Sequence, residues 1–160
     1  GNFKRNIKAV NPTADVVFED KDGEINQILE EDLPFDLNQP VIDLDTYAYG
    51  IWYLDAMDNL NRYIGKTIKF KAMVLRPKDG STDYFVPGRM AMTCCAEDMA
   101  FLGYACKYDK SAELTNKEWV EVTATVHQEF WKDYNGEGPV LHAVNVVPTK
   151  KPKDDVVSFN

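Results

Sequence analysis

The sequence has few of the residues on which enzymes and disulfide-rich scaffolds depend. Its 160 residues include 3 cysteines and 2 histidines. An odd number of cysteines cannot all pair within one chain, so at least one thiol must be free, bound to a ligand or joined to another molecule. No serine or cysteine lies in a nucleophile-elbow pattern, and no glycine-rich phosphate loop is present. We therefore predict that the domain is not an enzyme.

Basic residues and long apolar runs are also scarce. The 26 acidic residues outnumber the 18 Lys and Arg and give a formal net charge of -8. Eleven of these acidic residues fall within residues 15–45. Such a surface repels phosphate groups, so we expect no nucleic-acid binding and no direct binding to an anionic lipid surface.

Apolar stretches of the length that crosses a bilayer, about 18 to 20 residues, do not occur, and the first residues do not resemble a signal peptide. The chain opens with Gly1 rather than Met. We therefore expect that a leader or membrane anchor precedes this segment in the full-length protein.

The residues that are present favour one domain with its own core. Hydrophobic residues make up 44% of the chain and aromatic residues 12%, which is enough to form a core without disulfides. We predict an acidic extended arm with one hairpin over residues 1–44, a single domain over 45–150 and a solvated tail over 151–160. From Asp45 the apolar residues recur every three or four positions, and Gly65 offers a stop, which predicts a helix of about four turns.

After Gly65 the apolar period becomes two, as is typical of half-buried strands. Breaks rich in Gly, Pro and Asn divide this part of the sequence. We predict five strands, over residues 67–74, 84–95, 100–108, 119–130 and 139–147. Five such strands after one helix favour a mainly β domain with an OB-like barrel, because closing the sheet removes its edges.

Cys94 and Cys95 are the most distinctive chemical feature. Adjacent side chains on a strand point to opposite faces, so the two thiols can converge only if the strand ends there. Burial in the core is the simpler interpretation, because a free cysteine is among the most buried residue types. The alternative is a metal site, with zinc as the ion that thiolate and imidazole donors take; its candidate ligands are Cys94, Cys95, Cys106, His142 and Asp98. We place His127 on the outer face of its strand, apart from this set.

Thiol–disulfide chemistry at the same two cysteines is a further alternative. It requires a thiolate of lowered pKa, which Glu97 and Asp98 would oppose and Arg89 would favour.

Aromatic residues crowd the start of the predicted helix beside two carboxylates, Asp55 and Asp58. Such a cluster can bind a cationic or apolar ligand, but packing in the core is the simpler interpretation. The aromatic residues are Tyr47, Tyr49, Trp52 and Tyr53.

Part of the sequence resembles a known family. The matching stretches, in order, are Tyr63 to Lys66, Met73 to Arg76, Arg89, Cys94 to Asp98, Trp119 to Val122, and Val147 with Pro148. Their order and spacing resemble the C-terminal domain of the YcgQ family, over residues 60–150. The most specific part is the CCxxD stretch at residues 94–98.

The resemblance implies a domain of unknown function, in proteins described as subunits of a membrane permease, with the soluble part outside the cytoplasmic membrane. It implies Cys94, Cys95, Asp98, Arg89 and Trp119 as signature positions, and it implies no reaction. We therefore expect a non-enzymatic, extracytoplasmic accessory or binding module, exported or lipid-anchored, whose partner is a membrane permease. Metal binding and thiol–disulfide chemistry at the cysteine pair remain the alternatives.

Overall fold

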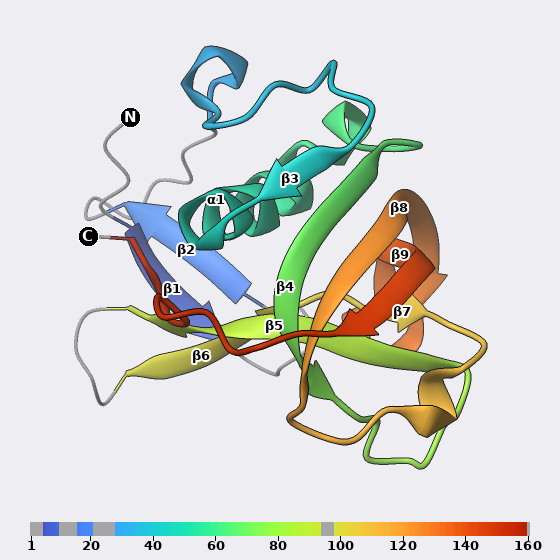
Figure 1. Cartoon of the computed structure of the whole chain (residues 1–160). Helices are drawn as coiled ribbons and strands as arrows, with labels where there is room; N and C mark the ends of the chain where they lie inside the picture. Colours follow the sequence, from blue (N-terminus) through green and yellow to red (C-terminus); the bar gives the residue numbers. More distant parts are fainter. Residues whose placement is uncertain (1–4, 10–15, 21–27, 94–97, 160) are drawn as a thin grey trace.

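A computed structural model of the chain describes residues 5–9, 16–20, 28–93 and 98–159 (Figure 1). Within these ranges the fold is mainly β, as the sequence predicts, with one α-helix, α1 (Thr46–Asp58). No helix in this part of the chain has both the length and the apolar character needed to cross a membrane.

The strands fall into two sheets. β1 and β2 pair with each other in an antiparallel fashion, within the arm for which the sequence predicts a hairpin. The other eight strands form one sheet. In chain order the strands are β1 (Arg5–Ala9), β2 (Val16–Asp20), β3 (Ile42–Leu44), β4 (Thr67–Leu75), β5 (Tyr84–Met92), β6 (Met99–Gly103), β7 (Cys106–Lys107), β8 (Trp119–Trp131), β9 (Gly136–Pro148) and β10 (Val157–Ser158).

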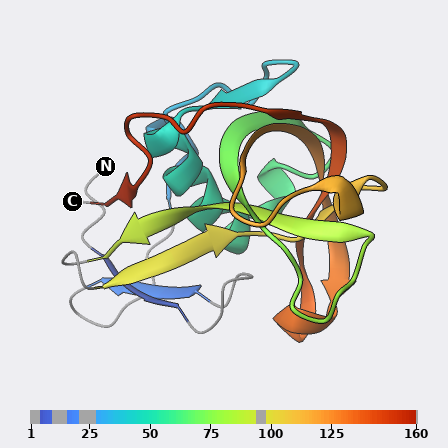
Figure 2. The same cartoon turned by 60° about the horizontal axis from the view of Figure 1, so that its bottom comes forward.

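Five strands of the larger sheet pair in a closed cycle. The antiparallel pairs are β4 with β5, β5 with β7, β9 with β8, and β8 with β4. The cycle is completed by a parallel pair, β7 with β9. β3 adds to β4, whereas β6 and β10 both add to β5. The strong curl of β4 (green) and β8 (orange-brown) that this cycle requires is visible in Figure 2.

One predicted strand, over residues 100–108, is divided in two. β6 and β7 are separated at Tyr104 and Ala105; β6 pairs with β5, and β7 pairs with both β5 and β9. The amide of Ala105 donates to the hydroxyl of Tyr134 at 2.8 Å, and its carbonyl accepts from the amide of Leu141 at 2.8 Å. These two bonds join the start of β7 to β9 and to Tyr134 in the 3-10 helix η4 (Lys132–Tyr134).

The helix is shorter than predicted. It begins after Asp45, whose side chain accepts a hydrogen bond from the amide of Ala48 at 2.9 Å, and it ends at Asp58 instead of continuing to Gly65. Asn59 departs from helical geometry, and the short 3-10 helix η2 (Leu60–Arg62) follows. Gly65 has φ +80° and opens the turn into β4, a conformation that favours glycine.

The core lies between α1 and the curved sheet. Tyr53 stacks on Tyr104 with ring centroids 4.5 Å apart, and Tyr49 lies 5.1 Å from Phe70. Tyr49, Trp52 and Tyr53 are all buried, so packing, the simpler interpretation of the aromatic cluster, is confirmed for them. Aromatic pairs of this kind contribute about 1 kcal/mol each beyond the area they bury. Tyr47 is the exception, since it is exposed.

The segment over residues 151–160 is not simply a solvated tail. β10 runs parallel to β5, and Val157 is buried. Gly50 in α1 makes room for it, because a Cβ at that position would lie 2.5 Å from a methyl carbon of Val157. Apolar side chains near the C-terminus thus pack against α1. The charged residues that precede them along the chain give no indication of this packing.

Candidate metal centre

Two of the predicted signature residues, Arg89 and Trp119, are in contact. The guanidinium carbon of Arg89 lies 5.3 Å from the centroid of the Trp119 ring, which is a cation–π distance. Arg89 is 2% exposed. Its Nε donates to the carbonyl of Lys71 and its Nη1 to the hydroxyl of Thr46, both at 2.8 Å, and Nη1 also donates to the carbonyl of Asp154. Arg89 therefore joins β4, α1 and the C-terminal segment, which is a structural role.

The structure does not bring Cys106 and His142 together as metal ligands. Cys106 is fully buried in the core, and burial raises the pKa of its thiol. It lies opposite Leu141, so His142, the next residue of β9, points to the other face of the sheet. Cys94 and Cys95 lie outside the described residues, and the predictions that involve them remain predictions. Asp98 is described, and its backbone carbonyl accepts from Thr93.

A different set of polar side chains meets on the outer face of the sheet, and it includes both histidines. Along β8 the small and apolar residues Ala124 and Val126 point to the core, so His127 and Glu129 point outward together. The pairing of β8 with β9 sets Thr125 opposite His142, on this same face.

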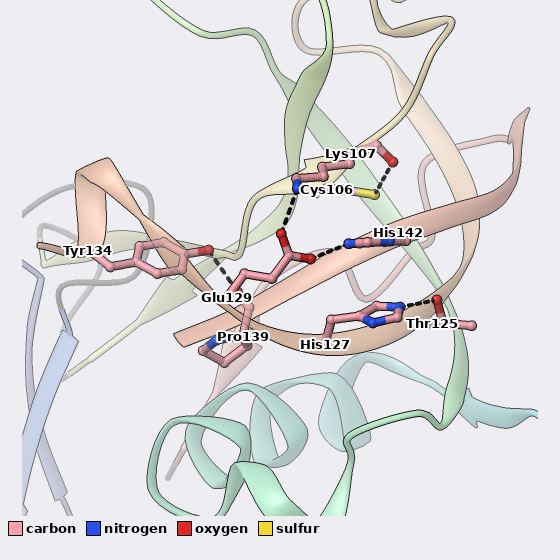
Figure 3. A network of polar contacts seen from close by, with 8 residues as sticks. All are labelled: Cys106, Lys107, Thr125, His127, Glu129, Tyr134, Pro139 and His142. Atoms are coloured by element: carbon pink, nitrogen blue, oxygen red, sulfur yellow. Dashed lines mark hydrogen bonds and ion pairs between the residues drawn. The ribbon is translucent and has the colours of Figure 1, made fainter. Parts of the chain in front are cut away.

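The third strand of this face is β7. Its register sets Lys107 beside His142 of β9. Three adjacent strands thus place Lys107, Glu129, His127 and His142 on one surface (Figure 3).

Glu129 is the centre of this cluster. Its Oε1 accepts from the Nζ of Lys107 at 2.5 Å, and its Oε2 is in contact with the Nε2 of His142. The rings of His127 and His142 stack with centroids 3.8 Å apart and an interplanar angle of 24°. One potential ligand atom from each of His127, Glu129 and His142 lies within 4.8 Å of the other two.

The electrostatics of the cluster favour the protonation states that bind metals. Desolvation acts to raise the pKa of Glu129, but hydrogen bonds from Lys107 and His142 outweigh it, so the pKa lies below its usual value. Desolvation and the neighbouring His142 lower the pKa of His127. Glu129 is therefore ionised and His127 neutral near pH 7, as metal ligands must be.

The remaining features suit an ion that enters from solvent. Thr125 Oγ1 lies 2.8 Å from Nε2 of His127, and a partner of this kind fixes the orientation of a ligating imidazole. The side chains of His142 and Glu129 are 40% and 26% exposed. Two imidazoles and one carboxylate are the ligand types of zinc sites that keep a coordination position open.

The sequence contains a pattern that indicates this cluster, although the cysteines were the more obvious candidates for metal ligands. His127 and Glu129 are two residues apart in a clearly alternating strand, so they share a face. A hairpin that turns near Asn135 and Gly136 brings the next strand back beside them, and His142 then falls on the same face. The outward position of His127 separates it from the cysteine-based set of ligands, but the cluster of His127, Glu129 and His142 lies on this same outer face of the sheet.

Comparison with known proteins identifies the family. Residues 20–157 match the family model described as the DUF1980 C-terminal domain. The UPF0703 protein YcgQ of Bacillus subtilis (strain 168) is 21% identical over 109 residues, which cover 66% of this chain and 38% of that protein. The chain thus matches less than half the length of this curated relative. It belongs to the DUF1980 C-terminal domain family.

Proposed function

We propose that this DUF1980 C-terminal domain is a non-enzymatic accessory module that binds a divalent transition-metal ion through His127, Glu129 and His142. One observation carries the proposal: three side chains of metal-ligand type converge within 4.8 Å on neighbouring strands. Imidazole nitrogen favours zinc and the ions that resemble it, whereas magnesium and calcium prefer sites made only of oxygen. Zinc is therefore the ion that we test first.

The proposed site suits an ion that is bound and released. Structural zinc sites are closed by four protein ligands, whereas three ligands leave a position for water or for another molecule. The cluster lies on an outer face, with its side chains partly exposed, so the ion can exchange without unfolding of the domain. Binding and release are what an accessory module that presents or senses an ion needs.

We further propose that the partner is a membrane permease and that the domain acts outside the cytoplasmic membrane, exported or lipid-anchored. The support for this is the resemblance of residues 60–150 to the YcgQ family, whose members are described as permease subunits; the 21% identity to YcgQ agrees with that resemblance. The acidic balance of the chain would also raise the local concentration of cations near such a partner.

The five-stranded cycle supports a finer proposal for the fold, an OB-like barrel. Barrels of this type close five strands in an order that differs from the sequence order. Here β9 lies between β7 and β8, and the parallel pairing with β7 completes the cycle. The cluster of Lys107, Glu129 and both histidines then lies on the outside of the barrel wall.

Zinc binding is tested by isothermal titration calorimetry of the whole chain, purified without chelator, with zinc chloride. We expect one ion per chain, and at least about tenfold weaker binding in His142→Ala and Glu129→Gln, because even residues that only support metal ligands contribute about 10- to 100-fold in affinity. The matched control is Glu121→Gln, on the same face of β8 but closer to its start.

A second control separates the new cluster from the cysteines. Zinc affinity should be unchanged when Cys94 and Cys95 are both replaced by serine. Stoichiometric binding that survives in His142→Ala but disappears in the double serine variant would refute the proposal and favour zinc handling through Cys94 and Cys95. The absence of zinc binding in the unmodified chain would also refute it.

A further inference from the structure

We propose that Lys107 is an internal competitor of the metal ion, and that its ammonium group must leave Glu129 before a divalent cation binds. This inference rests on the proposed metal site of His127, Glu129 and His142. Lys107 is a fourth residue of the site. It is not a metal ligand, but it controls the affinity and the selectivity of the site for metal ions.

The contacts of Glu129 show why competition arises. Lys107 Nζ lies 2.5 Å from Oε1, and the second oxygen, Oε2, is in contact with Nε2 of His142. Both oxygens of the carboxylate are therefore engaged, and the ammonium neutralises its charge. A metal ion bound to Glu129 would lie beside the Lys107 ammonium, and because the two positive charges repel each other, the ion replaces this contact.

The position of Lys107 allows this replacement without a change of fold. Its backbone belongs to β7 and is held in register beside His142, so the ammonium is always close to the site. The side chain is 47% exposed. A long, flexible lysine side chain can move its ammonium group from the carboxylate into water while the strand stays in place.

Competition by Lys107 would also select between ions. An ammonium that remains nearby repels a divalent cation, so binding must recover the cost of separating Lys107 from Glu129. Zinc gains two imidazole ligands in return. Magnesium prefers oxygen ligands and would gain little beyond the one carboxylate of Glu129, so Lys107 should exclude magnesium more effectively than zinc.

Lysine variants of the whole chain test the inference by calorimetric titration with zinc chloride and, separately, with magnesium chloride. We expect Lys107→Met to bind zinc about tenfold more tightly than the unmodified chain, because a repelling charge beside the ion is removed. The matched control is Lys69→Met, which removes another partly exposed lysine, one that pairs with Glu121 at 3.6 Å on the same sheet. Its zinc affinity should not change.

The outcomes distinguish this inference from the proposed function. If the unmodified chain binds zinc and Lys107→Met binds it equally or more weakly, the role of Lys107 is refuted while the metal site stands. If neither protein binds zinc, the metal site itself is refuted, and the inference with it. Circular dichroism confirms folding, and Lys107→Gln, which keeps a polar side chain without the charge, should shift the affinity in the same direction as Lys107→Met.

Discussion

At the scale of single residues, Asp55 is the buried charge on which the end of the helix depends. The residue is 0% exposed, and both carboxylate oxygens accept from Arg62 Nη1, at 2.8 and 3.0 Å. The hydroxyl of Tyr63 donates to Asp55 at 2.5 Å and the side-chain amide of Asn59 at 2.9 Å. Three donors thus hold the chain after α1 against the helix and stop it from continuing.

The change Asp55→Ala should therefore lower the free energy of unfolding by about 3 kcal/mol, the cost of leaving the partner of a buried ion pair uncompensated. Urea denaturation followed by circular dichroism measures it. Asp109→Ala is the control: Asp109 is exposed, and such a change should stay within about 0.5 kcal/mol. Equal stability of the two variants would mean that the network contributes nothing to the fold.

The residues of the site show how far sequence reasoning reaches at this scale. The alternation of β8 predicts correctly that His127 faces outward. Ligand type alone predicts that Cys106 and His142 bind one ion together. The register of β7 with β9 instead puts Leu141 opposite Cys106, so the side chains of Cys106 and His142 lie on different faces of the sheet. Register between distant strands depends on tertiary pairing, which no local pattern in the sequence contains.

At the scale of elements, the contact of β5 with β6 depends on Gly88. A Cβ at this position would lie 2.4 Å from the carbonyl oxygen of Leu102, which is backbone and cannot move aside as a side chain would. Gly88→Ala should therefore force the two strands apart and cost about 2 kcal/mol of unfolding free energy, as overpacking typically does.

Thermal and urea unfolding of Gly88→Ala measure this cost. Gly136→Ala is the matched control, because a Cβ at Gly136 meets nothing within 4 Å and that glycine has no positive φ. A Gly88 variant as stable as the Gly136 variant would contradict the close approach of β5 and β6.

The ends of the elements were less predictable than their existence. Apolar spacing predicts the helix and four of the five strands of the cycle as continuous segments. It does not reveal that β6 and β7 are separated at Tyr104 and Ala105, because the hydrogen bonds there come from Tyr134 and Leu141, which are distant in sequence. It also does not reveal that the helix ends before Gly65, where Asn59, Arg62 and Tyr63 bond to the buried carboxylate of Asp55. Tertiary hydrogen bonds override local propensity at these points.

At the scale of the whole molecule, buried tyrosines make stability depend on alkaline pH. Burial raises the pKa of five phenols above their ordinary value of 10.0, those of Tyr49, Tyr63, Tyr84, Tyr104 and Tyr134. The folded state keeps these protons when the unfolded state loses them. The stabilising contribution is therefore complete below the unfolded pKa and is lost as pH rises above it.

Stability to urea should thus be constant up to about pH 9 and fall steeply above about pH 10, where unfolded tyrosine ionises. Phenolate absorbance, recorded in parallel, should show that the buried tyrosines ionise only as the protein unfolds. Ionisation of all tyrosines near pH 10 without unfolding would contradict the burial of these side chains.

Composition and periodicity predicted the overall class well, a mainly β domain with one helix. They did not predict that the arm and the tail complete the sheet through β3 and β10. These strands are only three and two residues long, which is too short to show a periodic pattern. Their pairing depends on edges of β4 and β5 that exist only once the main sheet has formed.

The parallel pairing of β7 with β9 has a consequence for the order in which the chain folds during synthesis. β9 is the partner of both β7 and β8, and it follows them in the sequence. The cycle therefore cannot close on the ribosome until β9 has emerged, and until then β7 and β8 expose unpaired edges. Closure joins segments far apart in the chain, which makes it a slow step. A nascent chain of this family thus spends its most aggregation-prone interval just before its last long strand is released.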